Sequence, residues 1–104
     1  MASLPAQSRE ALAGGGNVVD LPPMLHITDV HRFAQTLGEA VARGDLVLDA
    51  ARLQSIDTAG IQLLCATRTA VLAAGRSFGW AAESAALRTA AGAAGLRAAL
   101  GLDA

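Results

Sequence analysis

Short apolar runs alternate with longer segments of helical periodicity along this chain, and that order leaves few possible folds. The clearest helical segment is "TDVHRFAQTLGEAVARG", residues 28–44. Thr28 is its expected N-cap, while Asp29 and Arg43 suit the charge of the first and last turns. We expect Gly44 to end the helix in a left-handed conformation. Apolar side chains recur at the i, i+3, i+4, i+7 spacing that lines one helix face: Val30, Phe33, Ala34, Leu37, Ala40 and Val41.

The middle of the chain continues the pattern with a strand, a connection and a second helix. "DLVLDA", residues 45–50, is short, apolar and bounded by acids, which predicts a strand buried on both faces. In the connection that follows, we expect Leu53 and Ile56 to anchor the chain to the core. The second helix is expected over residues 58–74, with Gln62 and Thr69 on the side opposite its apolar arc. That arc contains Ile61, Leu63, Leu64, Val71 and Leu72.

The C-terminal part predicts one more strand, one more helix and a final turn. "RSFGWAA", residues 76–82, reads as a strand with Phe78 and Trp80 on one face, because they are two residues apart. Ser84 is expected to cap a third helix through the alanine-rich residues 85–95. "LRAALGL" then predicts a last apolar turn or short helix.

The N-terminal part predicts two short extended segments around the glycine-rich turn at residues 14–16. Three glycines can cradle a phosphate, but only between a preceding strand and a following helix. Val18, Val19 and Leu21 follow them instead, which favours a strand and therefore a hairpin. Pro22 and Pro23 cannot donate to a ladder, so they mark an edge, a bulge or the end of that strand.

These elements predict an α/β fold in a single domain. Strands that alternate with helices indicate a mixed, mostly parallel sheet with right-handed crossovers, three to four packed helices and an N-terminal β-hairpin. We expect a flexible N-terminus at residues 1–7 and a folded domain at residues 8–104. The length of 104 residues suits one domain, and 53% hydrophobic residues suffice for a core without metal or disulfide support.

Composition argues against several classes of function. The net charge is -1, the chain has no lysine and its arginines form no basic block, so nucleic-acid binding is not expected. Cys65 is the single cysteine and falls in an apolar helical pattern, where it behaves as a small hydrophobe. No secretory signal or membrane-spanning stretch is recognisable, so we expect a cytoplasmic protein that does not insert into a membrane.

The side chains that enzymes use are sparse. His31 is expected to point to solvent from the first helix, and His26 follows the proline pair without an acid or second histidine at ligand spacing. Asp49 and Asp57 lie at opposite ends of one connection and could approach each other. A receiver-type phosphorylation site also needs an acidic pair after the first strand, where this chain has only Asp20. We therefore expect no catalytic residues, no metal and no cofactor. A deep pocket lined by His26, Asp49 and Asp57 would favour the rival class, an enzyme or small-ligand carrier.

The stretch "SIDTAGIQLL", residues 55–64, raises a sharper question about Thr58. A hydroxyl at the start of a helix is commonly a plain cap. The alternative is that Thr58 is displayed for modification or for a partner. Gly60 is a poor helix former, and its best explanation is close approach of another backbone or of a partner. Arg68 falls inside the apolar arc and either snorkels to its rim or meets an acidic partner surface.

The segment "LVLDAARLQSIDTAGIQLLCA" resembles the signature of STAS domains, the family of sulfate-transporter tails and anti-sigma-factor antagonists. The match is an apolar strand ending in Asp49, then Ile56, Asp57, Thr58, a small residue, Gly60 and an apolar helix. Residues 17–102 resemble the family in the same order of elements. At residues 23–26 this chain has "PMLH" where the family usually has Gly-Glu-Leu-Asp.

The resemblance implies a non-enzymatic regulatory module that binds a partner protein through the loop and helix start at Thr58. It makes Thr58 a phosphorylation candidate, as in an anti-sigma-factor antagonist or a chemotaxis-associated protein. The alternative that it implies is a cytoplasmic accessory subunit that stabilises the ATPase of an ABC-type lipid transporter. The expected partner is a kinase-type anti-sigma factor, a chemotaxis component or an ABC ATPase, and the oligomeric state stays open. The partner-binding candidates are Asp57, Thr58, Ala59, Gly60, Gln62 and His26.

Overall fold

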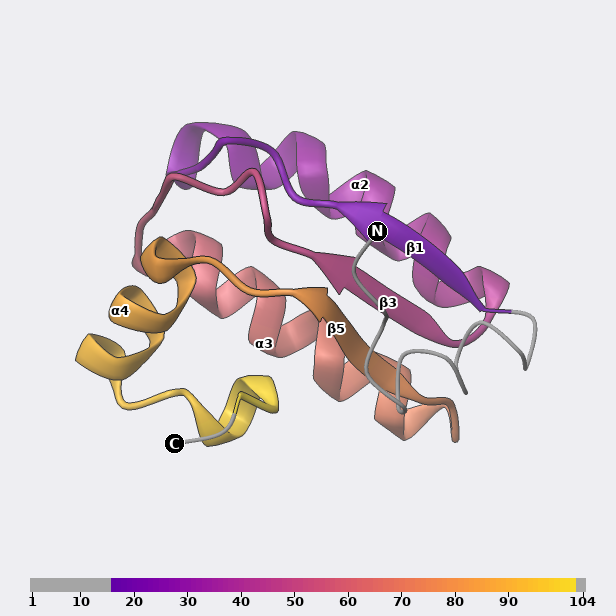
Figure 1. The fold of residues 1–104 in the computed structure, drawn as a ribbon. Helices are drawn as coiled ribbons and strands as arrows, with labels where there is room; N and C mark the ends of the chain where they lie inside the picture. Colours follow the sequence, from indigo (N-terminus) through magenta and orange to yellow (C-terminus); the bar gives the residue numbers. More distant parts are fainter. Residues whose placement is uncertain (1–15, 103–104) are drawn as a thin grey trace.

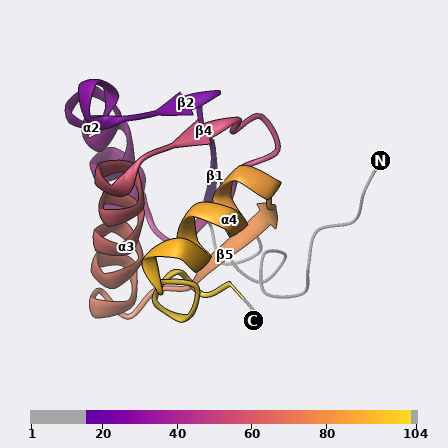
Figure 2. The same cartoon turned by 90° about the vertical axis from the view of Figure 1, so that its left-hand side faces the viewer.

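The computed structural model describes residues 16–102 and distributes their strands between two sheets, the larger seen in Figure 1 and the smaller in Figure 2. The larger sheet has the order β1-β3-β5 and the smaller one pairs β2 with β4. All of these pairings are parallel, so each needs a crossover connection rather than a tight turn. The strands are β1 (Asn17–Asp20), β2 (Met24–Leu25), β3 (Leu46–Asp49), β4 (Ser55–Ile56) and β5 (Phe78–Ala82).

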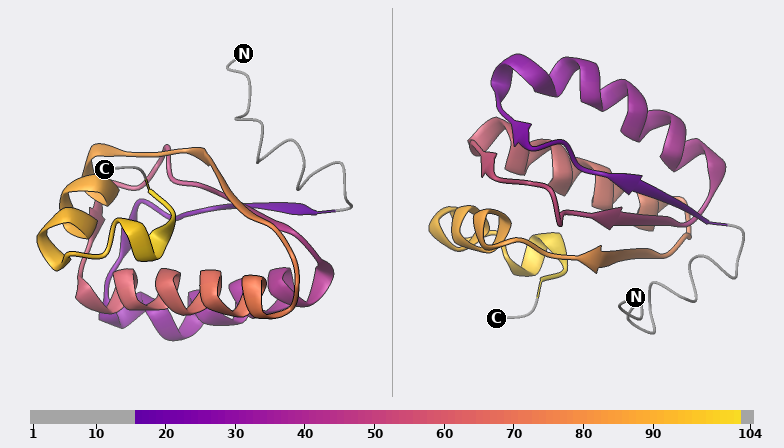
Figure 3. Two further views of the ribbon diagram at one scale, coloured as in Figure 1. Left: turned by 90° about the horizontal axis from the view of Figure 1, so that it is seen from below. Right: turned by 45° about the horizontal axis from the view of Figure 1, so that its top comes forward.

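Helices supply the crossovers and form the second layer of the described part of the chain. They are α2 (Ile27–Arg43), α3 (Thr58–Ala73) and α4 (Ala85–Ala94), followed by the short 3-10 helix η1 (Ala98–Leu100). α2 and α3 lie side by side on one face of the larger sheet (Figure 3), and α4 follows β5 to lie against β4 and α3 (Figure 2). The predicted α/β class is confirmed.

The core lies between the larger sheet and the helices. Leu46, Val47 and Leu48 of the central strand β3 are fully buried, which confirms the predicted burial of this strand on both faces. Phe78 and Trp80 share a face of β5, as predicted, with ring centroids 5.6 Å apart in an edge-on arrangement. The Trp80 Nε1–H donates to the Leu100 carbonyl oxygen at 2.9 Å, which ties η1 to the sheet.

The N-cap of the first helix lies two residues before the predicted one at Thr28. Its N-cap is His26, whose backbone N–H donates to the Asp29 carboxylate at 3.1 Å. At its other end, Gly44 has φ 147° and ψ -149°, so it is a glycine-specific extended residue and not the predicted left-handed helical one. The predicted acid in the first turn and arginine in the last turn are confirmed.

The second helix is confirmed over Thr58–Ala73, with one error in its apolar arc. Leu72 was predicted to face the core, but 45% of its surface is exposed. The buried stripe runs through Ile61, Leu64 and Val71, and Leu72 lies about 100° beyond that stripe. Gln62, Thr69 and His31 are exposed as predicted.

The connection predicted over residues 51–57 contains β4, which sequence reasoning missed. Leu53 is buried and Ile56 packs half-buried on the core, so both anchors are confirmed. β1 supplies the later half of the predicted N-terminal hairpin, and it ends before Pro22. The earlier half of that hairpin, and the domain boundary predicted after residue 7, lie outside the described residues. All strand pairs within residues 16–102 are parallel.

The remaining elements agree with the sequence. Ser84 caps α4 by accepting from the Leu87 N–H at 3.1 Å, and the chain closes with η1 where a last turn was expected. No helix in residues 16–102 combines the length and apolar character needed to cross a bilayer.

Candidate functional site at the start of α3

Asp57, and not Thr58, caps α3. The Asp57 Oδ1 accepts from the Gly60 N–H at 3.0 Å, so the helix begins at Thr58 with Asp57 as its N-cap. The interpretation of Thr58 as a plain cap is therefore wrong. A carboxylate accepts a stronger hydrogen bond than a neutral hydroxyl, so an aspartate directly before a threonine takes this role.

The second oxygen of Asp57 serves a different helix. Its Oδ2 accepts from the Ile27 N–H at 2.8 Å, and Ile27 is the first residue of α2. One carboxylate therefore satisfies otherwise unpaired donors at the starts of two helices. The bonds from Gly60 and Ile27 lower the pKa of Asp57 below its ordinary value, and the proximity of His26 adds to this effect.

Because Asp57 takes the capping role, the Thr58 side chain is left facing outward. Thr58 is exposed, and within residues 16–102 its hydroxyl has no hydrogen-bond partner. Gln62 lies one turn further along and is exposed too, while Ala59 is half-buried. Thr58 and Gln62 are thus neighbours on the outer side of α3, because residues four apart share a helix face.

Gly60 has a packing role instead of an exposed one. It is buried, and a Cβ at this position would overlap the Leu25 carbonyl oxygen and lie 2.6 Å from the Ile56 Cγ1. Of the two explanations offered by the sequence, close approach of another backbone is the one observed. Gly60 lets the start of α3 pack directly on the smaller sheet and thereby positions Thr58.

A shallow hollow opens beside Thr58, between the start of α3 and α4. It has a volume of about 310 Å³ and an extension along β4 toward the start of α4. Sequence reasoning missed the contribution of α4, because its alanines predict a helix but not which helix face borders a hollow. The hollow is lined by Ile56, Asp57, Thr58, Ile61, Ala90, Ala93 and Ala94.

His26 lies close to this site but does not line the hollow. It is half-buried at the N-cap of α2, and its Nε2 is 2.6 Å from the Ser55 Oγ. Asp49 is engaged elsewhere, since its carboxylate accepts from the Ala51 N–H at 2.8 Å. The hollow lined by Asp57 therefore contains neither His26 nor Asp49, and the pocket that would favour an enzyme or carrier is not formed there. Within residues 16–102, no group of three or more acidic, histidine or cysteine side chains is arranged to hold a metal ion.

The surroundings of Arg68 and Cys65 indicate that both residues contribute to packing. The Arg68 guanidinium donates to the Ala99 carbonyl oxygen at 3.3 Å and lies 6.0 Å from the centre of the Phe78 ring. Arg68 thus reaches the rim of the core and holds the C-terminal turn. Cys65 is half-buried, and burial raises the pKa of its thiol, as expected of a packing residue.

Comparison with known proteins identifies the family. A family model described as "Mlab, STAS domain" matches residues 8–102. A search of curated proteins and a search of solved structures each returned no match. STAS domains are generally non-enzymatic regulatory modules that commonly bind protein partners. The match spans nearly the whole sequence and includes the segment around Thr58, so this chain belongs to the STAS domain family.

Proposed function

We propose that this STAS domain binds a partner protein through the α3-start surface, which consists of Asp57, Thr58, Ala59, Gln62 and the adjoining hollow. The observation that carries the proposal is the division of roles at the helix start. Asp57 provides the cap, so the exposed Thr58 hydroxyl is not needed by the fold. A hydroxyl without a partner beside an apolar hollow suits the mixed character of a protein interface.

The surroundings of Thr58 favour docking over chemistry. A nucleophilic hydroxyl needs a base within hydrogen-bond reach, and the nearest ionisable group along the chain, Asp57, already accepts two backbone hydrogen bonds. The remaining side chains of the hollow are those of isoleucine and alanine. Small aliphatic side chains of this kind bury easily against another protein and contribute no catalytic group.

The partner that we favour is the ATPase of an ABC-type lipid transporter, with this domain as its cytoplasmic accessory subunit. Apart from Asp57 and Thr58, the side chains that line the hollow are aliphatic, and this supports the choice, because lasting interfaces are richer in apolar surface than transient ones. The end of β2 supports it as well. Met24, Leu25 and His26 stand where antagonists of anti-sigma factors carry an acid, and His26 hydrogen-bonds with Ser55 instead.

The second candidate is a signalling role switched by phosphorylation of Thr58, and the exposure of the Thr58 hydroxyl favours it. A phosphate there would meet backbone N–H groups and the positive end of the α3 dipole. It would also add a charge of roughly -1.5 to -2 beside Asp57. Phosphorylation would therefore spare the fold and disrupt an apolar contact with a kinase-type anti-sigma factor or a chemotaxis component.

Affinity capture from cells of the source organism tests these proposals. The baits are the wild type, Thr58→Glu and the matched control Thr69→Glu, whose threonine is exposed on the same helix. We expect an ABC ATPase to be retained by the wild type and Thr69→Glu and to be lost with Thr58→Glu. Capture of a histidine-kinase-like ATPase or a chemotaxis component instead would favour the signalling role. Equal capture by all three baits would contradict binding at Thr58.

Phosphorylation is tested separately by incubating the captured partner with this domain and ATP. Mass spectrometry of the tryptic peptide that contains Thr58 reports the modification. A phosphate on Thr58 supports the signalling role. An unmodified peptide, together with a stable complex, supports the accessory-subunit role.

A further inference from the structure

Two large apolar side chains lie exposed next to the α3-start surface, at the beginning of α2. Ile27 is 69% exposed and Met24 is 53% exposed. Apolar side chains that gather on a surface mark interaction sites more reliably than single ones. The Ile27 N–H donates to Asp57, the residue before Thr58, so the start of α2 directly adjoins the start of α3.

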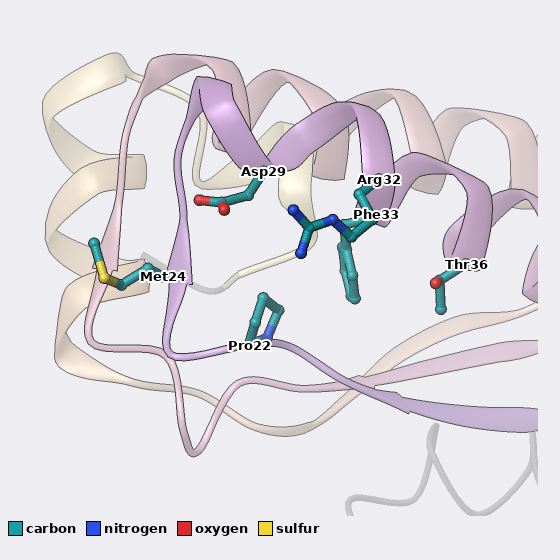
Figure 4. Close-up of a pocket in the computed structure, with 6 residues that line it drawn as sticks. All are labelled: Pro22, Met24, Asp29, Arg32, Phe33 and Thr36. Carbon is teal, nitrogen blue, oxygen red and sulfur yellow. The ribbon is translucent and has the colours of Figure 1, made fainter.

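Met24, but not Ile27, lines a pocket that opens between α2 and the segment that joins β1 to β2. Figure 4 shows Pro22 and Met24 on one side and Phe33 on the helix opposite. Asp29, Arg32 and Thr36 complete the lining. The volume is about 150 Å³. A cavity of about that volume holds a benzene-sized group, so there is room for one apolar side chain.

Arg32 supplies an unused positive charge in the lining of this pocket. It is exposed, and no group in residues 16–102 forms an ion pair or hydrogen bond with it. Asp29 lies three residues away on α2, but its carboxylate accepts from the His26 N–H at 3.1 Å. The planar guanidinium of arginine pairs best with a carboxylate, so the missing complement is an acidic group.

We propose that the partner-binding surface continues from Thr58 across Asp57 to the start of α2. There Ile27 forms an apolar contact next to Asp57, the pocket lined by Met24 takes an apolar side chain of the partner protein, and Arg32 binds a carboxylate from the same segment of the partner. This inference rests on the proposed partner-binding function and specifies the chemistry of the partner. The segment that binds is apolar and acidic, and not basic.

Five single variants test this extension against the partner obtained by capture. Ile27→Ser and Met24→Ser remove the apolar contacts, and Arg32→Gln removes the charge. Leu72→Ser and Arg43→Gln are matched controls, since Leu72 is 45% exposed in the last turn of α3 and Arg43 is exposed in the last turn of α2. The dissociation constant of each purified variant is measured at low and at moderate salt. Thermal unfolding shows that each variant is folded.

Ile27→Ser and Met24→Ser are each expected to weaken binding by about tenfold, because an apolar side chain that is buried on binding is lost. Arg32→Gln is expected to weaken binding and to reduce its dependence on salt, because a charge pair is removed. Both controls should bind like the wild type.

The outcomes separate this inference from the proposed function. If Thr58→Glu loses binding while Ile27→Ser and Arg32→Gln retain it, the extension to α2 is wrong and docking at Thr58 stands. If the α2 variants lose binding while Thr58→Glu retains it, the α2 contact is supported and docking at Thr58 is contradicted. If Arg32→Gln binds more tightly than the wild type, the partner segment is basic and the proposed charge is wrong.

Discussion

At the scale of single residues, the arrangement depends on which of two adjacent polar side chains caps α3. Asp57 has two carboxylate oxygens and uses one for each of two helix starts. Thr58 can offer one oxygen and is left exposed. Asp57 therefore stabilises the starts of two helices, and the exposed Thr58 hydroxyl has no part in capping.

Replacing Asp57 should reveal both of its hydrogen bonds. Asparagine retains one acceptor oxygen and alanine retains none, so we expect the free energy of unfolding to fall in the order wild type, Asp57→Asn, Asp57→Ala. Urea denaturation measures the order. Asp20→Asn, at the exposed end of β1, is the control and should match the wild type. Equal stability of Asp57→Asn and the wild type would show that only one oxygen matters, and equal stability of Asp57→Ala and the wild type would show that neither does.

The lowered pKa of Asp57 predicts a dependence of stability on pH. A carboxyl whose pKa is lower in the folded state stabilises the fold above its ordinary pKa of 3.8, and this contribution disappears as pH falls through the folded pKa. The stability advantage of the wild type over Asp57→Asn should thus be full near neutral pH and shrink below 3.8. Unfolding of both proteins at a series of pH values tests this. A difference that stays constant to the lowest pH would contradict the role of the ionised carboxylate.

At the scale of elements, the contact between α3 and the smaller sheet depends on the absence of a side chain at Gly60. We expect Gly60→Ala to destabilise the fold by about 1–3 kcal/mol, because the added Cβ overlaps the backbone of β2. Gly38→Ala is the matched control in α2, where a Cβ would meet nothing within 4 Å. It should stabilise the fold by about 0.5–1 kcal/mol through helix propensity. Chemical denaturation measures both, and a neutral Gly60→Ala would contradict the close packing.

The long elements could be predicted from sequence and the short ones could not. α2, α3 and β3 carry periodic or continuous apolar patterns, which bury enough surface to decide their structure locally. β2 and β4 have two residues each, too few for any periodicity, and they pair Met24 with Ser55 and Leu25 with Ile56, which are far apart in the sequence. The start of α2 was misplaced for a related reason. The backbone N–H of its first residue, Ile27, donates to the carboxylate of Asp57, which is 30 residues away in the sequence.

The site itself could be predicted only in part. The motif predicts Thr58, and helical spacing predicts Gln62, as exposed candidate residues. The hollow depends on α4, whose alanines look alike in sequence whether they face the core, the solvent or a groove. Gly60 stands out in the sequence because glycine is a poor helix former, but its burial against Leu25 is seen only in the structure.

At the scale of the whole molecule, parallel strands gather the helix starts at one end. β2 leads into α2, β4 leads into α3 and β5 leads into α4, so each of these helices begins beyond the carboxyl end of a strand (Figure 2). Loops at that edge of an α/β sheet commonly carry binding residues. Thr58, His26 and Ile27 come together there although they belong to different elements.

The central claim is that Thr58 serves recognition and not folding, and one paired measurement on Thr58→Glu tests it most directly. The dissociation constant for the captured ATPase is determined by titration calorimetry, and the free energy of unfolding is determined on the same preparation, with Thr69→Glu alongside. We predict that Thr58→Glu binds at least about tenfold more weakly while its stability stays within about 0.5 kcal/mol of the wild type. Thr69→Glu should match the wild type in both. Unchanged binding by Thr58→Glu, or a collapse of its stability, would contradict this role of Thr58.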